Sequence, residues 1–183
     1  MRTQSYLAHA LVPVTAIVAP VTIVQTAFCR EYLSVSQAQS ALFPGAQFTQ
    51  QSIKLGSDQL KEIKQLSGVR QRDKSPQVWR ADRGGLAGWF IVDDVIGKHE
   101  YITYGAAISP QGKVIGVEVL VYRETHGDEI LQESWRRNFK GKDLGDKFAL
   151  DQDIPNISGA TLSCRNVTDG VKRLLALHKV ALR

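Results

Sequence analysis

After an apolar N-terminal stretch, hydrophobic residues first recur with the spacing of amphipathic helices. Ser34 and Gln37 match the capping box of a first predicted helix, which Pro44 ends. A second helix is predicted to begin at Ser57 and to end at Gly68, because glycine readily adopts the left-handed backbone of a helix C-terminus. The chain after the leader is therefore expected to begin with helices.

From Gln77 onward, the spacing of hydrophobic residues no longer fits helices. Segments rich in aromatic and β-branched residues predict strands. These segments are residues 77–81, 88–95, 100–109 and 113–124. Short turn sequences join neighbouring segments at 96–99 and 110–112, so we expect an antiparallel sheet.

Two more helices are predicted after the strands. The first runs from about Asp128 to Gly141, with Leu131, Trp135 and Phe139 on one face. The second begins near Thr161, and its apolar face consists of Val167, Val171, Leu174, Leu175, His178 and Leu182. Helices segregated from an antiparallel sheet define the α+β class, so we expect an α+β fold with an antiparallel β-sheet and flanking helices.

The N-terminal stretch has the composition of an export signal. No acidic residue, lysine or arginine occurs between Arg2 and Arg30, and residues 7–24 are almost entirely apolar. The small residues on either side of Phe28 form a cleavage site. We therefore expect residues 1–29 to be a signal peptide and the protein to be periplasmic. The alternative is an uncleaved membrane anchor, because the apolar stretch approaches the roughly 20 residues that span a bilayer.

Residues 30–183 are expected to form one domain, of which 30–80 is a helical N-terminal part. The composition, with 43% hydrophobic and 22% charged residues, is typical of a globular protein. The net charge of +5 arises from basic residues scattered among acidic ones, so we expect no nucleic-acid partner. The sequence has no nucleophile elbow, phosphate loop or dinucleotide-binding glycine motif, and no catalytic residue is assigned.

Small and hydroxylated residues occupy the start of the last predicted helix, in the segment Ser158-Gly159-Ala160-Thr161-Leu162-Ser163. The first N–H groups of a helix lack intrahelical partners and carry partial positive charge, so a phosphate is readily held there. Gly159 and Ala160 would let a phosphate approach the backbone beside the Thr161 hydroxyl. The alternative is that Ser158 or Thr161 simply caps the helix.

The stretch from Gly112 to Gly141 contains a second motif, Glu124-Thr125-His126-Gly127. In order and spacing, the two motifs together resemble the FMN-binding domain family. Its members include the C subunit of the sodium-translocating NADH:quinone oxidoreductase and the G subunit of the Rnf complex. The resemblance covers roughly residues 88–182. Pro155 stands where family members usually have Asp, and Asp153 lies two residues earlier.

The resemblance implies covalent FMN, joined through its phosphate to Thr161. A flavin transferase that uses FAD and Mg²⁺ would attach it and release AMP. The other residues of the first motif would surround the phosphate, namely Ser158, Gly159, Ala160, Leu162 and Ser163. The second motif lies near the isoalloxazine ring in the family, which implies flavin contacts for Glu124, Thr125, His126 and Gly127.

The resemblance also implies an exported electron-transfer flavoprotein, more an electron carrier than a stand-alone enzyme. Redox membrane proteins or cytochromes would be its electron partners, and an uncleaved leader would add membrane association. Covalent attachment suits the periplasm, because a cofactor lost there would not be replaced. The alternatives are a flavin-dependent reductase of a small acceptor and a non-redox binding module.

Two other groups of residues are candidates for chemistry. A metal site could combine His99 and Glu100 with Glu124 and His126, but these ligands lack a recognised spacing, so no metal is expected. Cys164 is either a small buried hydrophobe or a group near the cofactor.

Overall fold

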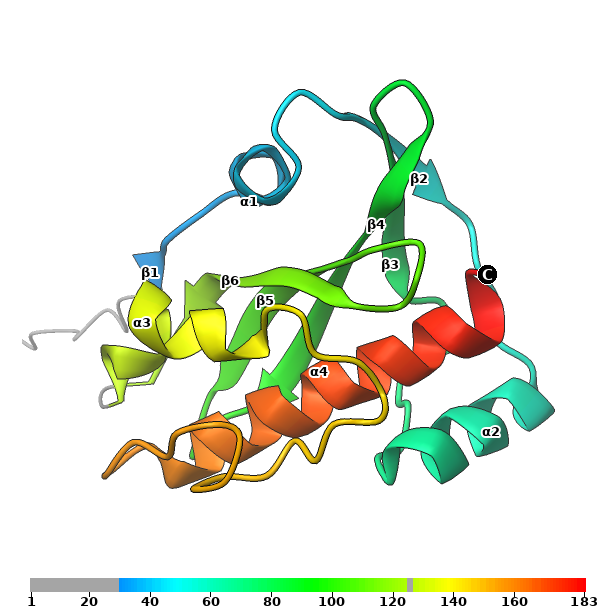
Figure 1. The fold of residues 1–183 in the computed structure, drawn as a ribbon. Helices are drawn as coiled ribbons and strands as arrows, with labels where there is room; N and C mark the ends of the chain where they lie inside the picture. The colour runs from blue at the N-terminus through cyan, green and yellow to red at the C-terminus, as the bar shows by residue number, and fades with distance from the viewer. Residues whose placement is uncertain (1–29, 125–126) are drawn as a thin grey trace, which may run out of the picture.

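The computed structural model describes residues 30–124 and 127–183. Within them the strands form one antiparallel sheet in the order β1-β6-β5-β4-β3-β2 (Figure 1). The strands are β1 (Arg30–Glu31), β2 (Gln47–Gln51), β3 (Gln77–Asp82), β4 (Leu86–Ile96), β5 (Tyr101–Ile108) and β6 (Val114–Tyr122). Consecutive strands from β2 to β6 are neighbours; short turns join β3 to β4, β4 to β5 and β5 to β6, whereas α2 lies between β2 and β3 in the chain.

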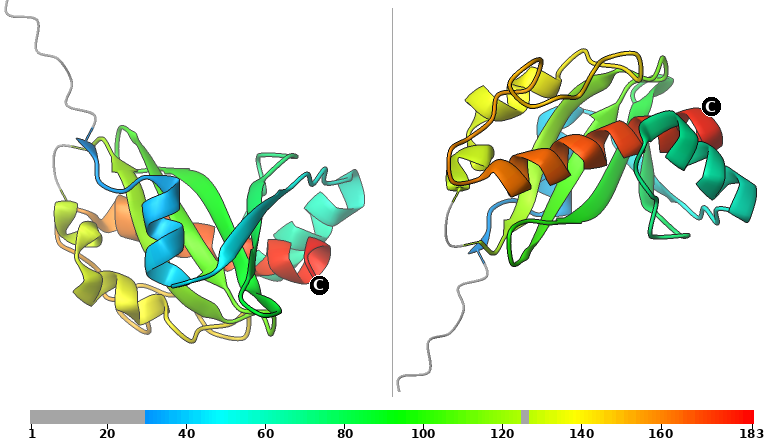
Figure 2. Two further views of the ribbon diagram at one scale, coloured as in Figure 1. Left: turned by 90° about the horizontal axis from the view of Figure 1, so that it is seen from above. Right: turned by 90° about the horizontal axis from the view of Figure 1, so that it is seen from below.

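Helices cover both faces of the sheet (Figure 2). On one face, α1 (Val35–Leu42) packs against β5 and β6. On the other, the long helix α4 (Thr161–Ala181) crosses β4 and β5, and α2 (Ser57–Ser67) packs against α4. The predicted α+β fold is therefore confirmed. No helix among the described residues combines the length and hydrophobicity needed to cross a bilayer.

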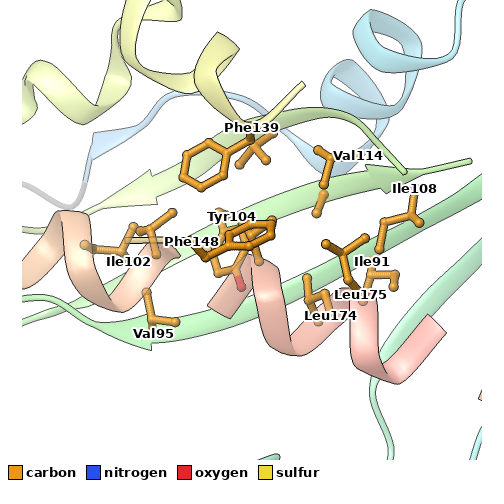
Figure 3. Close-up of a cluster of buried hydrophobic side chains, with 14 of the residues drawn as sticks. Ile91, Val95, Ile102, Tyr104, Ile108, Val114, Phe139, Phe148, Leu174 and Leu175 are labelled. Atoms are coloured by element: carbon orange, nitrogen blue, oxygen red, sulfur yellow. The ribbon is translucent and has the colours of Figure 1, made fainter. Parts of the chain in front are cut away.

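Each face of the sheet has its own hydrophobic core. The larger core fills the space between the sheet and α4, where Tyr104, Leu174 and Leu175 are buried (Figure 3). The smaller core lies on the α1 side and includes Phe90 and Leu120. Burying a side chain of this size contributes about 1.5–3 kcal/mol, so these two layers hold the helices on the sheet.

A buried polar cluster also joins α4 to the sheet. Asp93 on β4 accepts a hydrogen bond of 2.6 Å from the Tyr104 hydroxyl and forms an ion pair with Arg173 on α4. Gly170 leaves room for the Tyr104 hydroxyl against the helix, because an added Cβ would collide with it. The cluster therefore sets the position of α4 along β4.

The hydrophobic pattern predicts most element positions correctly. The four predicted strands are confirmed, with ends shifted by no more than a few residues. The Ser34 capping box and the left-handed Gly68 at the end of α2 are also confirmed. The pattern missed β1 and β2, so the segment 30–80 is not purely helical. Strand β2 is polar and mostly exposed, and its pairing with β3 defines it.

The continuous helix predicted from Asp128 is wrong. The structure instead has a short helix, α3 (Glu133–Arg136), with one 3₁₀ turn before it (Asp128–Leu131) and one after it (Arg137–Phe139). Gln132, between the first turn and α3, is extended, with φ −71° and ψ 135°. Arg136 instead donates hydrogen bonds to the carbonyl oxygens of Leu131 and Val117, which ties the segment to β6. These side-chain bonds accompany the break in the helix, while Trp135 and Phe139 still reach the core.

His178 lies on the buried face of α4 as predicted, and 1% of its surface is exposed. Neither ring nitrogen has a hydrogen-bond partner among the described residues. Burial lowers the pKa of His178, and the positive charge of Arg183 lowers it further. The side chain therefore acts as a neutral core residue.

Candidate functional site

The start of α4 has no side-chain cap. Thr161 is the first helical residue, and Ala160 occupies the N-cap position with φ −121° and ψ 18°. The alternative that Ser158 or Thr161 caps the helix is therefore wrong. Without a capping side chain, the N–H groups of the first turn remain available to an anion, as at other phosphate-binding helix starts.

A cavity of about 560 Å³ lies beside this helix start. One wall is formed by the first motif, and the other by residues from the β4–β5 turn and the end of β6. The lining residues are Lys98, His99, Glu124, Gly159, Ala160, Thr161, Leu162 and Ser163. Thr161 is half-buried, so the cavity borders a threonine that is not sealed in the core. Leu162 is 46% exposed at its edge.

The second motif meets the first through a close backbone contact. Gly127 has φ +84°, and a Cβ added there would collide with the Cβ of Ala160. Only glycine fits both the backbone conformation and the space. Glu124, at the other end of the motif, lines the cavity. Thr125 and His126 lie outside the described residues.

Glu124 is bound by backbone groups of the β4–β5 turn. Its Oε1 accepts hydrogen bonds from the N–H groups of His99, at 2.6 Å, and Glu100, at 3.0 Å. Burial works to raise the pKa of Glu124, but these backbone bonds outweigh it and lower the pKa. Glu124 is therefore a charged turn-holding residue as well as a cavity residue.

Ser163 and Cys164 face a different environment from Thr161. Both are buried, and Ser163 hydrogen-bonds to the side chain of Tyr122. Burial raises the pKa of Tyr122 to about 12, while the Ser163 bond opposes the shift. Burial also raises the pKa of the Cys164 thiol, which disfavours the reactive thiolate. Cys164 thus acts as a small core residue, and Thr161 has the more accessible hydroxyl.

Asp153 lies in the loop before α4, where its carboxylate binds neighbouring groups. Its carboxylate accepts hydrogen bonds from the N–H groups of Phe148 and Ala149 and from Lys142 Nζ. Burial works to raise the pKa of Asp153, but these bonds lower it to about 2. Asp153 therefore stabilises the loop. At Pro155, the carbonyl oxygen accepts a 2.8 Å hydrogen bond from Trp135 Nε1.

The alternative metal site has no support in the described part of the chain. No group of three or more His, Cys, Asp or Glu side chains there is arranged to hold a metal ion. Of the four residues considered, Glu124 is bonded to backbone N–H groups and His126 is outside the described ranges.

Sequence reasoning did not select Lys98 for the site. It lies in the turn between β4 and β5, more than fifty residues before Thr161, and lines the same cavity. The sequence suggests its neighbour His99 only as a ligand in the alternative metal site. No local pattern marks either residue, because sheet pairing, the Glu124 hydrogen bonds and the bond from Asn166 on α4 to the Ile96 carbonyl place the turn beside α4.

Comparison with known proteins defines the class of this site. Residues 97–176 match the model of a family described as the FMN-binding domain, and all the lining residues fall within that range. This part of the chain is therefore similar to an FMN-binding domain. The fold is also similar to the crystal structure of NqrC from Shewanella oneidensis, with a TM-score of 0.47 and 18% sequence identity. That match covers 69% of this chain and 63% of NqrC, so the chain spans less than two thirds of it. A comparison with curated proteins finds no match.

The residues present fit FMN. The cavity volume of 560 Å³ lies within the roughly 300–1,000 Å³ typical of small-molecule sites. The uncapped first turn of α4 offers N–H groups to a phosphate, and the space beside Gly159 is open, since an added Cβ would meet no atom within 4 Å. These are the groups that would hold FMN.

The contact between the two motifs gives a first prediction. Gly127→Ala should lower the free energy of unfolding by about 1–3 kcal/mol, because the new Cβ collides with Ala160. It should also weaken FMN retention. Gly159→Ala is the matched control, since its φ is +83° but its Cβ would meet nothing. Urea denaturation measures the free energy of unfolding of both variants. An equal decrease in Gly127→Ala and Gly159→Ala would contradict a specific role for the Gly127 contact.

Proposed function

We propose that this protein is an exported electron carrier whose FMN is joined through its phosphate to the Thr161 hydroxyl. The proposal rests mainly on one observation: Thr161 lies at the uncapped start of α4, on the wall of a flavin-sized cavity. The N–H groups of the helix start would stabilise the negative charge of the phosphate. The Thr161 oxygen would then form the ester bond.

Attachment requires a separate enzyme. In the proposed reaction, a flavin transferase with Mg²⁺ transfers the FMN part of FAD to the Thr161 oxygen. The bond between the two phosphates of FAD breaks, AMP leaves, and the threonine hydroxyl loses its proton. The role of this chain is to present the hydroxyl and to hold the product phosphate. Thr161 is preferred over Ser163 because Ser163 is buried and bonded to Tyr122.

A transferase coexpression experiment tests the attachment site. Wild-type protein should gain one FMN by intact-mass spectrometry, and the gain should disappear in Thr161→Ala. Thr161→Ser keeps a hydroxyl and should retain some attachment. Ser163→Ala should still be modified, because its hydroxyl is not the acceptor. Unmodified wild type, or a Thr161→Ala protein that still carries FMN, would refute the covalent assignment.

Bound FMN would supply reversible electron transfer, and this chain would control its access and potential. The proposed partners are membrane redox proteins or cytochromes. The competing function is reduction of a small acceptor. Both require FMN, so they differ in what oxidises the loaded protein.

Electron transfer can be measured on the anaerobically reduced protein by stopped-flow absorbance. A carrier should be reoxidised by a cytochrome or a quinone, and only slowly by small organic acceptors. Flavin absorbance reports each transfer directly. Rapid multiple turnover with small acceptors alone would instead identify a reductase.

The proposed location is the periplasm. Support comes from the leader sequence, in which residues 7–24 are almost entirely apolar and follow Arg2. N-terminal sequencing of protein from the periplasmic fraction should begin at or near Arg30. A chain that retains Met1 in the membrane fraction would indicate an anchor, and one confined to the cytoplasm would contradict export.

A further inference from the structure

Two side chains hold the β4–β5 turn to the rest of the site: Asn166 on α4 donates a 2.7 Å hydrogen bond to the Ile96 carbonyl where the turn begins, and Glu124 binds the backbone within the turn. Glu124 Oε1 accepts the N–H groups of His99 and Glu100, and the Gly97 N–H closes the turn with a 2.7 Å bond to the Glu100 carbonyl. Gly97 lies close to the Glu124 side chain, and a Cβ added to Gly97 would collide with Glu124 Oε1. These bonds form a clasp between the end of β6 and residues 97–100.

The clasp brings positive charge to the cavity. Lys98 lines the cavity, is exposed, and forms no salt bridge with any described residue. If the FMN phosphate is bound at Thr161, we place the flavin ring against the wall formed by the other lining residues. That wall consists of Lys98, His99 and Glu124.

We propose that Glu124 is a positioning residue, which holds the ammonium group of Lys98 beside the flavin ring and thereby raises the reduction potential of FMN. This inference rests on the proposed function, because it requires FMN in this cavity. Reduction adds negative charge to the flavin, so a nearby cation stabilises the reduced form more than the oxidised form.

The charge of Glu124 and its clasp act on the potential in opposite directions. Acting only through its negative charge, Glu124 would lower the potential, and any loss of the carboxylate would raise it. Acting through Lys98, it raises the potential, and opening the turn lowers it. Gly97→Ala separates these effects, because it disturbs the clasp without changing a charge.

The experiment measures the flavin midpoint potential by spectroelectrochemical titration of the FMN-loaded full chain. Lys98→Gln and Gly97→Ala should each shift it to more negative values. Gly97→Ala should add no further shift in the Lys98→Gln background, since the clasp acts through Lys98. Glu124→Gln keeps an oxygen acceptor for the two N–H groups, so its potential should stay unchanged or rise. Lys64→Gln, on α2, is the charge-matched control and should cause no shift.

The proposal is overturned if Gly97→Ala leaves the potential unchanged or raises it, or if Lys98→Gln has no effect. Hydrogen exchange of the flavin-free chain provides a readout independent of FMN. Exchange at the amides of His99 and Glu100 should accelerate in Gly97→Ala and much less in Glu124→Gln. A chain that takes up no FMN but shows this exchange pattern would refute the proposed function while the clasp stands. Unchanged exchange would refute the clasp itself.

Discussion

The placement of α4 across the sheet is the constraint on which the site depends. The helix buries one face against β4 and β5, and the Asp93–Arg173 ion pair with the Tyr104 hydroxyl sets its position along β4. Because an α-helix is rigid, this packing also fixes where its first turn lies. The uncapped N–H groups therefore end beside the β4–β5 turn, where a cavity forms.

Contacts with backbone groups position the residues around this cavity. Gly127 reaches Ala160 because neither its conformation nor the space admits a side chain. The Glu124 carboxylate accepts hydrogen bonds from two N–H groups of the β4–β5 turn. The uncapped N–H groups at the start of α4 are likewise placed by the fold, so a bound anion would meet donors already in place.

The sequence predicted the strands well because their residues alternate and are separated by clear turn signals. It predicted α1, α2 and α4 because their apolar faces and ends follow helical rules. It failed at β2, whose polar residues become a strand only by pairing with β3, and at the segment after Asp128. There, hydrogen bonds from Arg136 to Val117 and Leu131 accompany the break in the helix, which helical spacing alone does not encode.

By itself, the sequence determined the α+β class, the helix start at Thr161 and the two motifs that resemble those of FMN-binding domains. These features are local, since each depends on residues close together in the chain. Only the tertiary structure decided that Ala160 is the N-cap, that Ser163 is buried, and that Lys98 shares a cavity with Thr161. Such facts depend on contacts between distant segments, and a single sequence carries no record of which segments meet.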